Sequence, residues 1–268
     1  MDRLIYLYGL VPAGGIEQQP LPALKGFDGK EEIYTIEIGS IAAVVSSLDP
    51  LENSEDIIKD KTNNDMEWLQ EKAFHHHETV LKLSNEYTII PLKFCTLYKN
   101  QGSLVQAVQT NETKLVDTLE LLTGNEEWNF KIYCDDKLLK EEISKNNVSI
   151  ETKREEINQL PKGKQFFEKK KLDKLIDAEL EEEKNKISEK IHEHLQTFTL
   201  KGHIKRTWNK DVTGRKENMT WNSVYLIPVS GVEEFLQQIQ EYEKDMKEKG
   251  WRFEASGPWP AYHFSSFY

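Results

Sequence analysis

The order of apolar segments in the second half of the chain most constrains what it can fold into. From residue 128 onward the pattern predicts strand, helix, strand, strand, helix and strand, at residues 128–134, 164–198, 203–212, 221–229, 232–249 and 251–256. This βαββαβ order is that of ferredoxin-like folds, in which two helices cover one face of a four-stranded antiparallel sheet. We therefore predict a ferredoxin-like C-terminal domain over residues 125–256, with helix and loop inserted at 136–163, where the sequence is polar and charged.

The first half predicts a different α+β domain, over residues 1–124. Three antiparallel strands are expected from the β-branched and aromatic runs at residues 4–11, 33–38 and 41–48. A hairpin is expected near Gly39, and the stretch 12–30, rich in proline and glycine, is expected to be a loop.

Two helices and a further strand complete this domain. Over residues 64–87 apolar positions recur at alternating intervals of three and four, as on one face of a helix: Met66, Leu69, Ala73, His76, Val80, Leu83 and Tyr87. Residues 88–97 predict a strand with an edge or bulge at Pro91, and residues 104–122 a second helix that Gly124 ends as a C-cap. The fold class is α+β, with antiparallel sheets and long helices in two domains.

The charge balance and the cysteines exclude several classes of function. The chain has 46 acidic and 35 basic residues, a formal net charge of −11. Because affinity for nucleic acid depends on basic side chains that neutralise phosphates, nucleic acid is excluded as a partner. No window approaches the ~18 apolar residues that cross a bilayer, so no membrane span is expected. Cys95 and Cys134 have neither disulfide-framework nor zinc spacing, which predicts buried thiols in a reducing, cytoplasmic compartment.

The histidines are the strongest metal candidates, but their spacing argues against a site. Adjacent residues on a helix point about 100° apart, so His75, His76 and His77 cannot converge on one ion. We expect His76 in the core and its two neighbours on the surface. The pair His192 and His194 is expected on a solvated helix face.

No motif of a catalytic or cofactor site is present. The sequence lacks a nucleophile elbow, a Walker-type loop and a dinucleotide-binding glycine motif, so we assign no catalytic, cofactor-binding or metal-ligating residues and expect no cofactor. A thiol in an apolar strand, as expected for Cys95, is usually inert. A metal- or thiol-dependent enzyme built on 75–77 or Cys95 is the less favoured alternative.

One segment stands out as cationic in an acidic chain. Lysines surround Phe166 and Phe167 between residues 162 and 174. We expect the two rings to pack on the sheet while the lysines stay in water. Binding of an acidic partner surface is compatible with this packing.

The C-terminal segment Gly257–Tyr268 combines five aromatic residues with Pro258 and Pro260. The prolines favour an extended, polyproline-like path. Each large aromatic side chain offers about 150–250 Å² for burial, so this tail must pack on its own protein or on a partner.

Five motifs in order resemble the gas vesicle protein F/L family, over essentially the whole chain. They are Ile5-Tyr6-Leu7-Tyr8-Gly9, Trp68-Leu69-Gln70-Glu71-Lys72-Ala73 with His77-Glu78, Ile90-Pro91-Leu92-Lys93-Phe94, Glu127-Trp128 before Lys131-Ile132-Tyr133, and Gly257-Pro258-Trp259-Pro260 before Tyr262-His263-Phe264. The triple histidine and the stretch 166–171 look like versions from Gram-positive bacilli, nearer the L branch.

The resemblance implies a non-enzymatic accessory protein of gas vesicle assembly, cytoplasmic and associated with gas vesicles. Such a protein is expected to bind the small, very hydrophobic shell protein A and other accessory proteins during nucleation or growth. A minor structural component of the vesicle shell is the alternative. The tail 257–268 is expected to fold back and clamp the two domains. Candidate interaction or interdomain contacts are aromatic: Tyr6, Tyr8, Trp68, Phe94, Trp128, Trp259, Tyr262 and Phe264.

Overall fold

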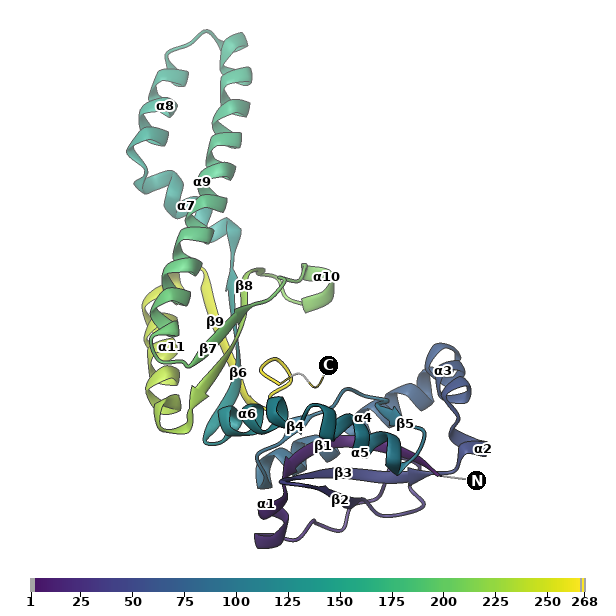
Figure 1. The fold of residues 1–268 in the computed structure, drawn as a ribbon. Coiled ribbons are helices and arrows are strands. Elements are labelled where there is room, and N and C mark those ends of the chain that lie inside the picture. The colour runs from purple at the N-terminus through teal and green to yellow at the C-terminus, as the bar shows by residue number, and fades with distance from the viewer. Residues whose placement is uncertain (1–2, 266, 268) are drawn as a thin grey trace. The chain divides into compact units, whose positions relative to one another are not determined.

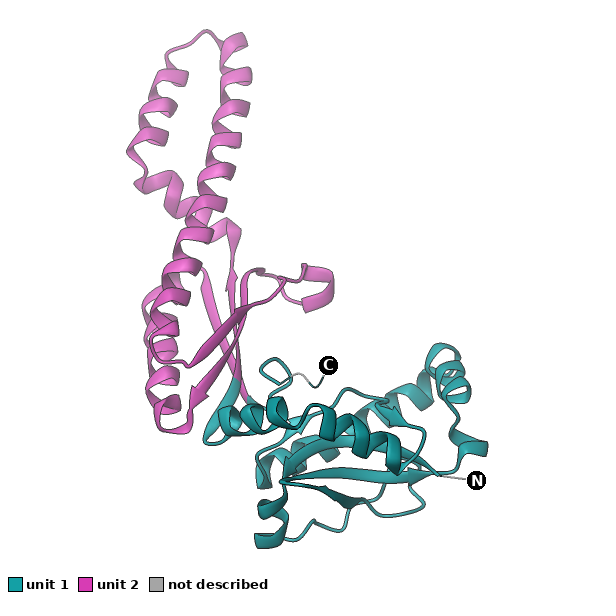
Figure 2. Ribbon diagram, viewed as in Figure 1, with its two compact units in different colours: residues 1–127, 258–268 teal, residues 128–257 magenta. Residues whose placement is uncertain are grey.

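The computed structural model describes residues 3–265 and 267, which form a mixed α/β structure with antiparallel sheets and long helices (Figure 1). The chain divides into two compact units (Figure 2). Unit 1 comprises residues 1–127 and 258–268, and unit 2 comprises residues 128–257. Among the described residues, no helix combines the length and apolar composition that crossing a membrane requires.

Unit 1 is built on a sheet whose central strand is buried on both faces. Its strands are β1 (Leu4–Pro12), β2 (Tyr34–Ile38), β3 (Ile41–Leu48), β4 (Ile90–Pro91) and β5 (Leu97–Tyr98). The order is β2-β3-β1-β4, with β5 also paired to β1, and all of these pairs are antiparallel. Gly39 has φ +61° between β2 and β3, a backbone conformation that favours glycine, so the expected ladder of three strands and its hairpin are confirmed.

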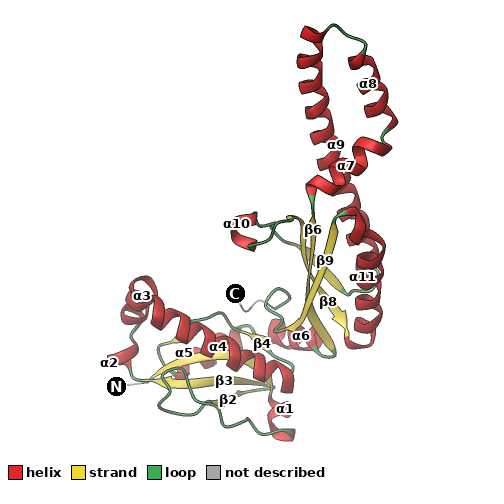
Figure 3. Ribbon diagram, turned by 180° about the vertical axis from the view of Figure 1, so that it is seen from behind, coloured by secondary structure: helices red, strands yellow, loops and turns green. Residues whose placement is uncertain are grey.

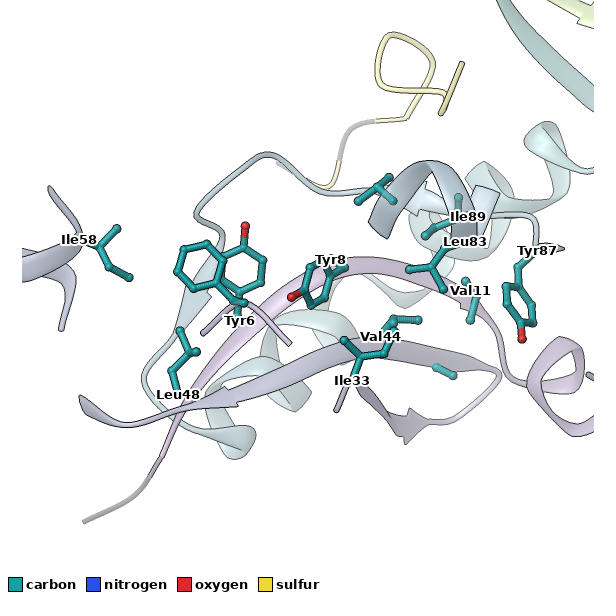
Figure 4. Packing of buried hydrophobic residues seen from close by; sticks show 13 residues of the cluster. Tyr6, Tyr8, Val11, Ile33, Val44, Leu48, Ile58, Leu83, Tyr87 and Ile89 are labelled. Atoms are coloured by element: carbon teal, nitrogen blue, oxygen red, sulfur yellow. The ribbon is translucent and has the colours of Figure 1, made fainter. Parts of the chain in front are cut away.

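Most helices of unit 1 begin where a short polar side chain caps them. They are α1 (Ala13–Gln18), α2 (Pro50–Asn53), α3 (Glu55–Asn64), α4 (Met66–Glu86), α5 (Gln101–Thr110) and α6 (Glu112–Leu122). The Asp65 carboxylate accepts the Trp68 N–H at 3.0 Å and so starts α4. Val80 and Leu83 of α4 pack with Tyr6 and Tyr8 of β1 in one apolar cluster (Figure 4).

Three expectations for unit 1 need correction. The stretch 12–30 contains the short helix α1, and the single strand expected over 88–97 is only β4 and β5. Pro91 has no N–H for the ladder, and a turn with Cys95 at φ +62° follows it. The second helix is two helices, because the chain breaks at Asn111, which has non-helical backbone angles.

Unit 2 contains a four-stranded sheet in the order β7-β8-β6-β9. The strands are β6 (Asn125–Cys134), β7 (Lys201–Ile204), β8 (Asn218–Pro228) and β9 (Trp251–Trp259). The helices are α7 (Asp136–Asn146), α8 (Val148–Asn158), α9 (Lys162–Gln196), α10 (Lys210–Thr213) and α11 (Val232–Met246), with single 3-10 turns at Val229–Gly231 and Lys247–Lys249. Leu195 of α9 and Phe235 of α11 share a core with Phe130 of β6 and Tyr225 of β8, so both helices cover one face of the sheet (Figure 3).

The long helix α9 has two differently packed halves. Its C-terminal half packs on the sheet, whereas Leu172 and Ile176 of its N-terminal half form a separate small core with Ile150 and Ile157 of α8. The inserted segment 136–163, expected as one helix and a loop, is therefore two helices that support this part of α9.

Three expectations for unit 2 are wrong. The strand expected over 203–212 ends at Ile204, because Asn209 caps the short helix α10 instead. His192, expected on a solvated face, is buried with its Nδ1 2.5 Å from the Tyr225 Oη, since it lies on the side of α9 that faces β8. Phe166 and Phe167 do not pack on the sheet but are 61% and 66% exposed, because they lie off the Leu172–Ile176 stripe.

Candidate interaction surface

Two of the predicted contact residues, Tyr6 and Tyr8, are core residues of unit 1. Both are fully buried, with ring centroids 4.9 Å apart. The Tyr6 Oη accepts the Cys95 N–H at 3.2 Å and lies 2.9 Å from the His76 Nδ1. The His76 Nε2 lies 3.0 Å from the Leu92 carbonyl oxygen. Because a carbonyl can only accept, His76 carries its proton on Nε2, and Tyr6 donates to Nδ1.

The surroundings of His75 and His76 favour their neutral forms. Burial lowers the pKa of His76 to about 4, and burial is also the main cause that lowers the pKa of His75. The His75 Nε2 lies 3.3 Å from the Tyr8 Oη. The prediction that His76 is a core residue is confirmed, but His75 and His77 are half-buried and not simply surface residues. The network satisfies buried polar atoms and therefore acts in stability.

Substituting His76 by phenylalanine tests this structural role. The variant leaves the Tyr6 hydroxyl and the Leu92 carbonyl without their partner, so at neutral pH we expect a loss of about 1–2 kcal/mol of unfolding free energy. Urea denaturation measures the loss. Gln70→Ala, at an exposed position of the same helix, is the control and should change stability little. A His76→Phe variant as stable as wild type would contradict the assignment.

The comparison of wild type with His76→Phe also predicts how stability depends on pH. The folded state disfavours protonated His76, so its contribution is complete above the unfolded pKa near 6.5 and is lost as pH falls toward about 4. The stability difference between wild type and His76→Phe should shrink between about pH 7 and pH 5, by up to about 1.4 kcal/mol per pH unit. His75 is present in both proteins, so its contribution to the pH dependence cancels in the difference. A difference independent of pH over this range would rule the mechanism out.

The other predicted aromatic residues divide between the two cores and the surface. Trp68, Phe94 and Tyr262 are half-buried and pack on the apolar cluster of unit 1. Trp128 packs on the core of unit 2 instead. Phe264 is half-buried, and Trp259 is 37% exposed.

Neither cysteine has the surroundings of a reactive thiol. Burial raises the pKa of Cys95 to about 11 and that of Cys134 to about 12, so both are protonated near neutral pH. Cys95 is half-buried and lies in a turn, which corrects the expectation of a buried thiol within a strand. Within residues 3–265 and 267, no group of three or more histidine, cysteine, aspartate or glutamate side chains is placed to hold a metal ion.

The tail packs on unit 1 through a buried carboxylate. The Glu127 side chain is only 2% exposed and accepts two hydrogen bonds from His263: the backbone N–H at 2.9 Å and the Nδ1 at 2.7 Å. Pro260, Ser265 and Phe267 are buried as well. Burial raises the pKa of Tyr262 to about 12. The tail is thus folded as part of unit 1 and is not a free peptide.

Exposed apolar side chains of unit 1 lie on one flank of α4. Met66 and Phe74 are 66% and 63% exposed, and His77 is half-buried with its ring 6.0 Å from that of Trp259. At 100° per residue Met66, Phe74 and His77 fall within an arc of about 80° around the helix. We call Met66, Phe74, His77 and Trp259 the outer stripe.

Sequence reasoning found only part of the outer stripe. It named Trp259, but it placed Met66 on the inner face of the helix and did not consider Phe74. An isolated phenylalanine among polar residues was the available clue, since it breaks the inward spacing of the helix. The outer stripe combines exposed large apolar side chains of α4 with Trp259 of β9.

Comparison with known proteins identifies the family. The family model described as gas vesicle synthesis protein GvpL/GvpF matches residues 4–266. The chain belongs to this gas vesicle protein family. Gas vesicle protein L of Streptomyces sp. (strain CB03234) is 20% identical over 265 residues, which cover 98% of this chain and 93% of that protein. Gas vesicle protein F1 of Halobacterium salinarum is 29% identical over 151 residues, which cover 54% of this chain and 63% of that protein.

Solved structures of family members share the fold. The crystal structure of GvpF from Anabaena sp. PCC7120 matches with a TM-score of 0.73 at 20% identity and covers 99% of both chains. GvpF from Microcystis aeruginosa matches with a TM-score of 0.66 at 19% identity, over 99% of this chain and 100% of that one. The relatives carry the names of gas vesicle proteins and of no enzyme. A role in gas vesicle formation follows from family membership.

Proposed function

We propose that this chain is a non-enzymatic, cytoplasmic accessory protein of gas vesicle assembly that binds the hydrophobic shell protein through the outer stripe of unit 1. The observation that carries the proposal is the exposure of Met66 and Phe74 on one flank of α4, with Trp259 of β9 beside His77 of the same flank, in a member of this family. Single apolar residues are common on surfaces, but large ones gathered on one flank of a helix favour a binding site.

The chemistry of the outer stripe suits an apolar partner. Aromatic residues and methionine are enriched in protein interfaces, where their desolvation provides most of the binding free energy. Trp259 is held beside His77 by a tail whose buried anchor, Glu127, fixes its position, so little conformational freedom is lost on binding. The gas vesicle shell protein A and other gas vesicle accessory proteins are the partners that we expect.

Co-purification with an affinity-tagged shell protein tests the proposal. The double variant Met66→Gln, Phe74→Gln should bind at least about tenfold more weakly, and Trp259→Ala should weaken binding in the same direction. These side chains are exposed, so the variants should remain folded. The matched control is Leu51→Gln, which removes a 71% exposed side chain of α2 outside the outer stripe. Unchanged binding by both stripe variants would refute the assignment of this surface.

We further propose that unit 2 is a ferredoxin-like domain with α7 and α8 inserted in its first crossover. The strand order β7-β8-β6-β9 places the first and third strands of the unit at the centre of the sheet, as that fold requires. The domains would then be 1–124 with the returning tail 257–268, and 125–256.

A further inference from the structure

The N-terminal end of α9 exposes two aromatic rings that belong to neither apolar cluster found among the described residues of unit 2. Phe166 and Phe167 are 61% and 66% exposed, and their ring centroids lie 5.7 Å apart in an edge-on arrangement. Lys170 places its Nζ 5.2 Å from the centroid of Phe166. We call Phe166, Phe167 and the lysines of residues 162–174 the arm tip.

The arm tip has the opposite charge from the remainder of the chain. Residues 162–174 contain six lysines and two acidic residues, a net charge of +4, which leaves −15 for the rest of a chain whose total is −11. Lys171 is partly neutralised by Glu168 at 2.7 Å, but both rings and most of the lysines face water. A complementary partner surface therefore combines apolar side chains with acidic ones.

Unit 2 itself contains a pocket with these properties. It has a volume of about 540 Å³ and an apolar lining that includes Leu139, Ile143, Ile187, Met246 and Trp251. Glu142, Glu179 and Glu183 line it as well. Lys249 also lines it and lies 3.9 Å from Glu142, which leaves a net negative charge among these residues. Val148, which also lines it, is 80% exposed. We call this pocket the α7–α9 groove.

We propose that the arm tip of one copy of this chain binds in the α7–α9 groove of a second copy. The two phenylalanine rings would cover the apolar lining, and Lys169 and Lys170 would face the glutamates around it. The contact cannot form within one chain. Phe166 and Glu183 are 17 residues apart on the same rigid helix, which separates them by about 25 Å.

Local charge favours this occupant. Each copy carries a net charge of −11, so the attraction comes from the charges at the contact and not from the chains as wholes. A groove with three glutamates presents a compact negative charge that the arm tip can neutralise alone.

The geometry makes the contact heterologous. Phe167 and Glu183 are 16 residues apart, which places them about 160° apart around α9. One copy can therefore offer its arm tip to one neighbour and its groove to another. Such contacts build rings or open chains of copies and not closed dimers.

Sedimentation velocity of the purified full-length chain tests the inference. Wild type should form species larger than a monomer as its concentration rises through the micromolar range, and Phe166→Ser, Phe167→Ser should weaken self-association more than about tenfold. Val229→Ser, at a 54% exposed site of unit 2 away from both surfaces, is the control and should associate like wild type.

A charge exchange identifies the two surfaces as partners. The tip variant Lys169→Glu, Lys170→Glu and the groove variant Glu142→Lys, Glu183→Lys should each remain monomeric alone, whereas their mixture should associate again because opposite charges face each other at both contacts. A monomeric wild type at every concentration, or a mixture that stays monomeric, would overturn the proposal. Loss of binding to anionic vesicles by the tip variant, without any self-association of wild type, would assign the arm tip to lipid instead. Both surfaces lie in unit 2, so this result is independent of shell-protein binding through unit 1.

Discussion

Substitution of Gly9 by alanine is expected to destabilise unit 1 by about 3 kcal/mol. Gly9 lies in the buried central strand β1, just after the register shift that follows Leu7. A Cβ at this position would lie 2.4 and 2.6 Å from the side chain of Ile89 and 3.0 Å from the backbone oxygen of Ile90. Because β4 pairs with β1 here and Ile89 is buried, the Ile89 side chain can make room only by shifting within the core. Chemical denaturation of the purified variant measures the effect.

A second variant separates this clash from the general effect of replacing glycine. Gly14→Ala adds a Cβ in α1 where nothing lies within 4 Å, so it should be neutral or stabilising by up to about 1 kcal/mol. Ile89→Ala removes both clashing side-chain atoms, so Gly9→Ala, Ile89→Ala should be destabilised by less than the sum of the single variants. Strictly additive effects would show that Ile89 is not the obstacle.

Replacement of His263 by alanine is expected to lower stability by about 2–3 kcal/mol and to release the tail. The Glu127 carboxylate is almost fully buried and would keep only the backbone N–H of residue 263. A buried carboxylate that loses a partner bears an uncompensated desolvation cost. The expected loss of unfolding free energy is below the range usual for a broken buried ion pair, because the His263 side chain is 38% exposed. Denaturation measures the stability, and limited proteolysis followed by mass spectrometry measures release of residues 258–265.

The matched comparison for the tail is Glu127→Gln. This variant removes the charge but keeps an oxygen that can accept the N–H of residue 263, so it should be less destabilised than His263→Ala. Equal protease resistance of His263→Ala and wild type would show that the tail is held by its aromatic contacts alone.

Elements with strong periodicity could be predicted from the sequence, and those set by tertiary contacts could not. The alternating spacing in α4 and the β-branched run of β3 located both elements within two residues. The prediction of a strand over 203–212 was wrong because the Asn209 side chain caps α10, and this cap competes with strand pairing. The intrinsic strand propensity of these residues does not show which of the two prevails. The prediction for His192 was wrong because its polar neighbours in the sequence indicated a solvated helix face. Its hydrogen-bond partner, the Tyr225 hydroxyl, comes from a strand distant in the sequence.

The candidate site shows the same division. Aromatic composition identified Tyr6, Tyr8 and Trp259 alike, yet the first two are buried and only the third is exposed. Burial and binding select the same large apolar side chains, so sequence alone cannot separate the two uses. The outer stripe became visible only when the inward face of α4 was known, because Phe74 is defined by lying off that face. The cationic segment 162–174 was visible in the sequence, but the exposure of Phe166 and Phe167 was not.

The division of the chain into units has a consequence for biosynthesis. Unit 2 is a continuous stretch, 128–257, whereas unit 1 needs residues from both ends of the chain. Chains fold as they leave the ribosome, and continuous domains can fold as soon as they emerge. Unit 2 can therefore fold before unit 1 is complete, and Trp259 joins His77 only after the last segment has been translated. A prematurely terminated chain would thus lack Trp259, one of the four residues of the outer stripe.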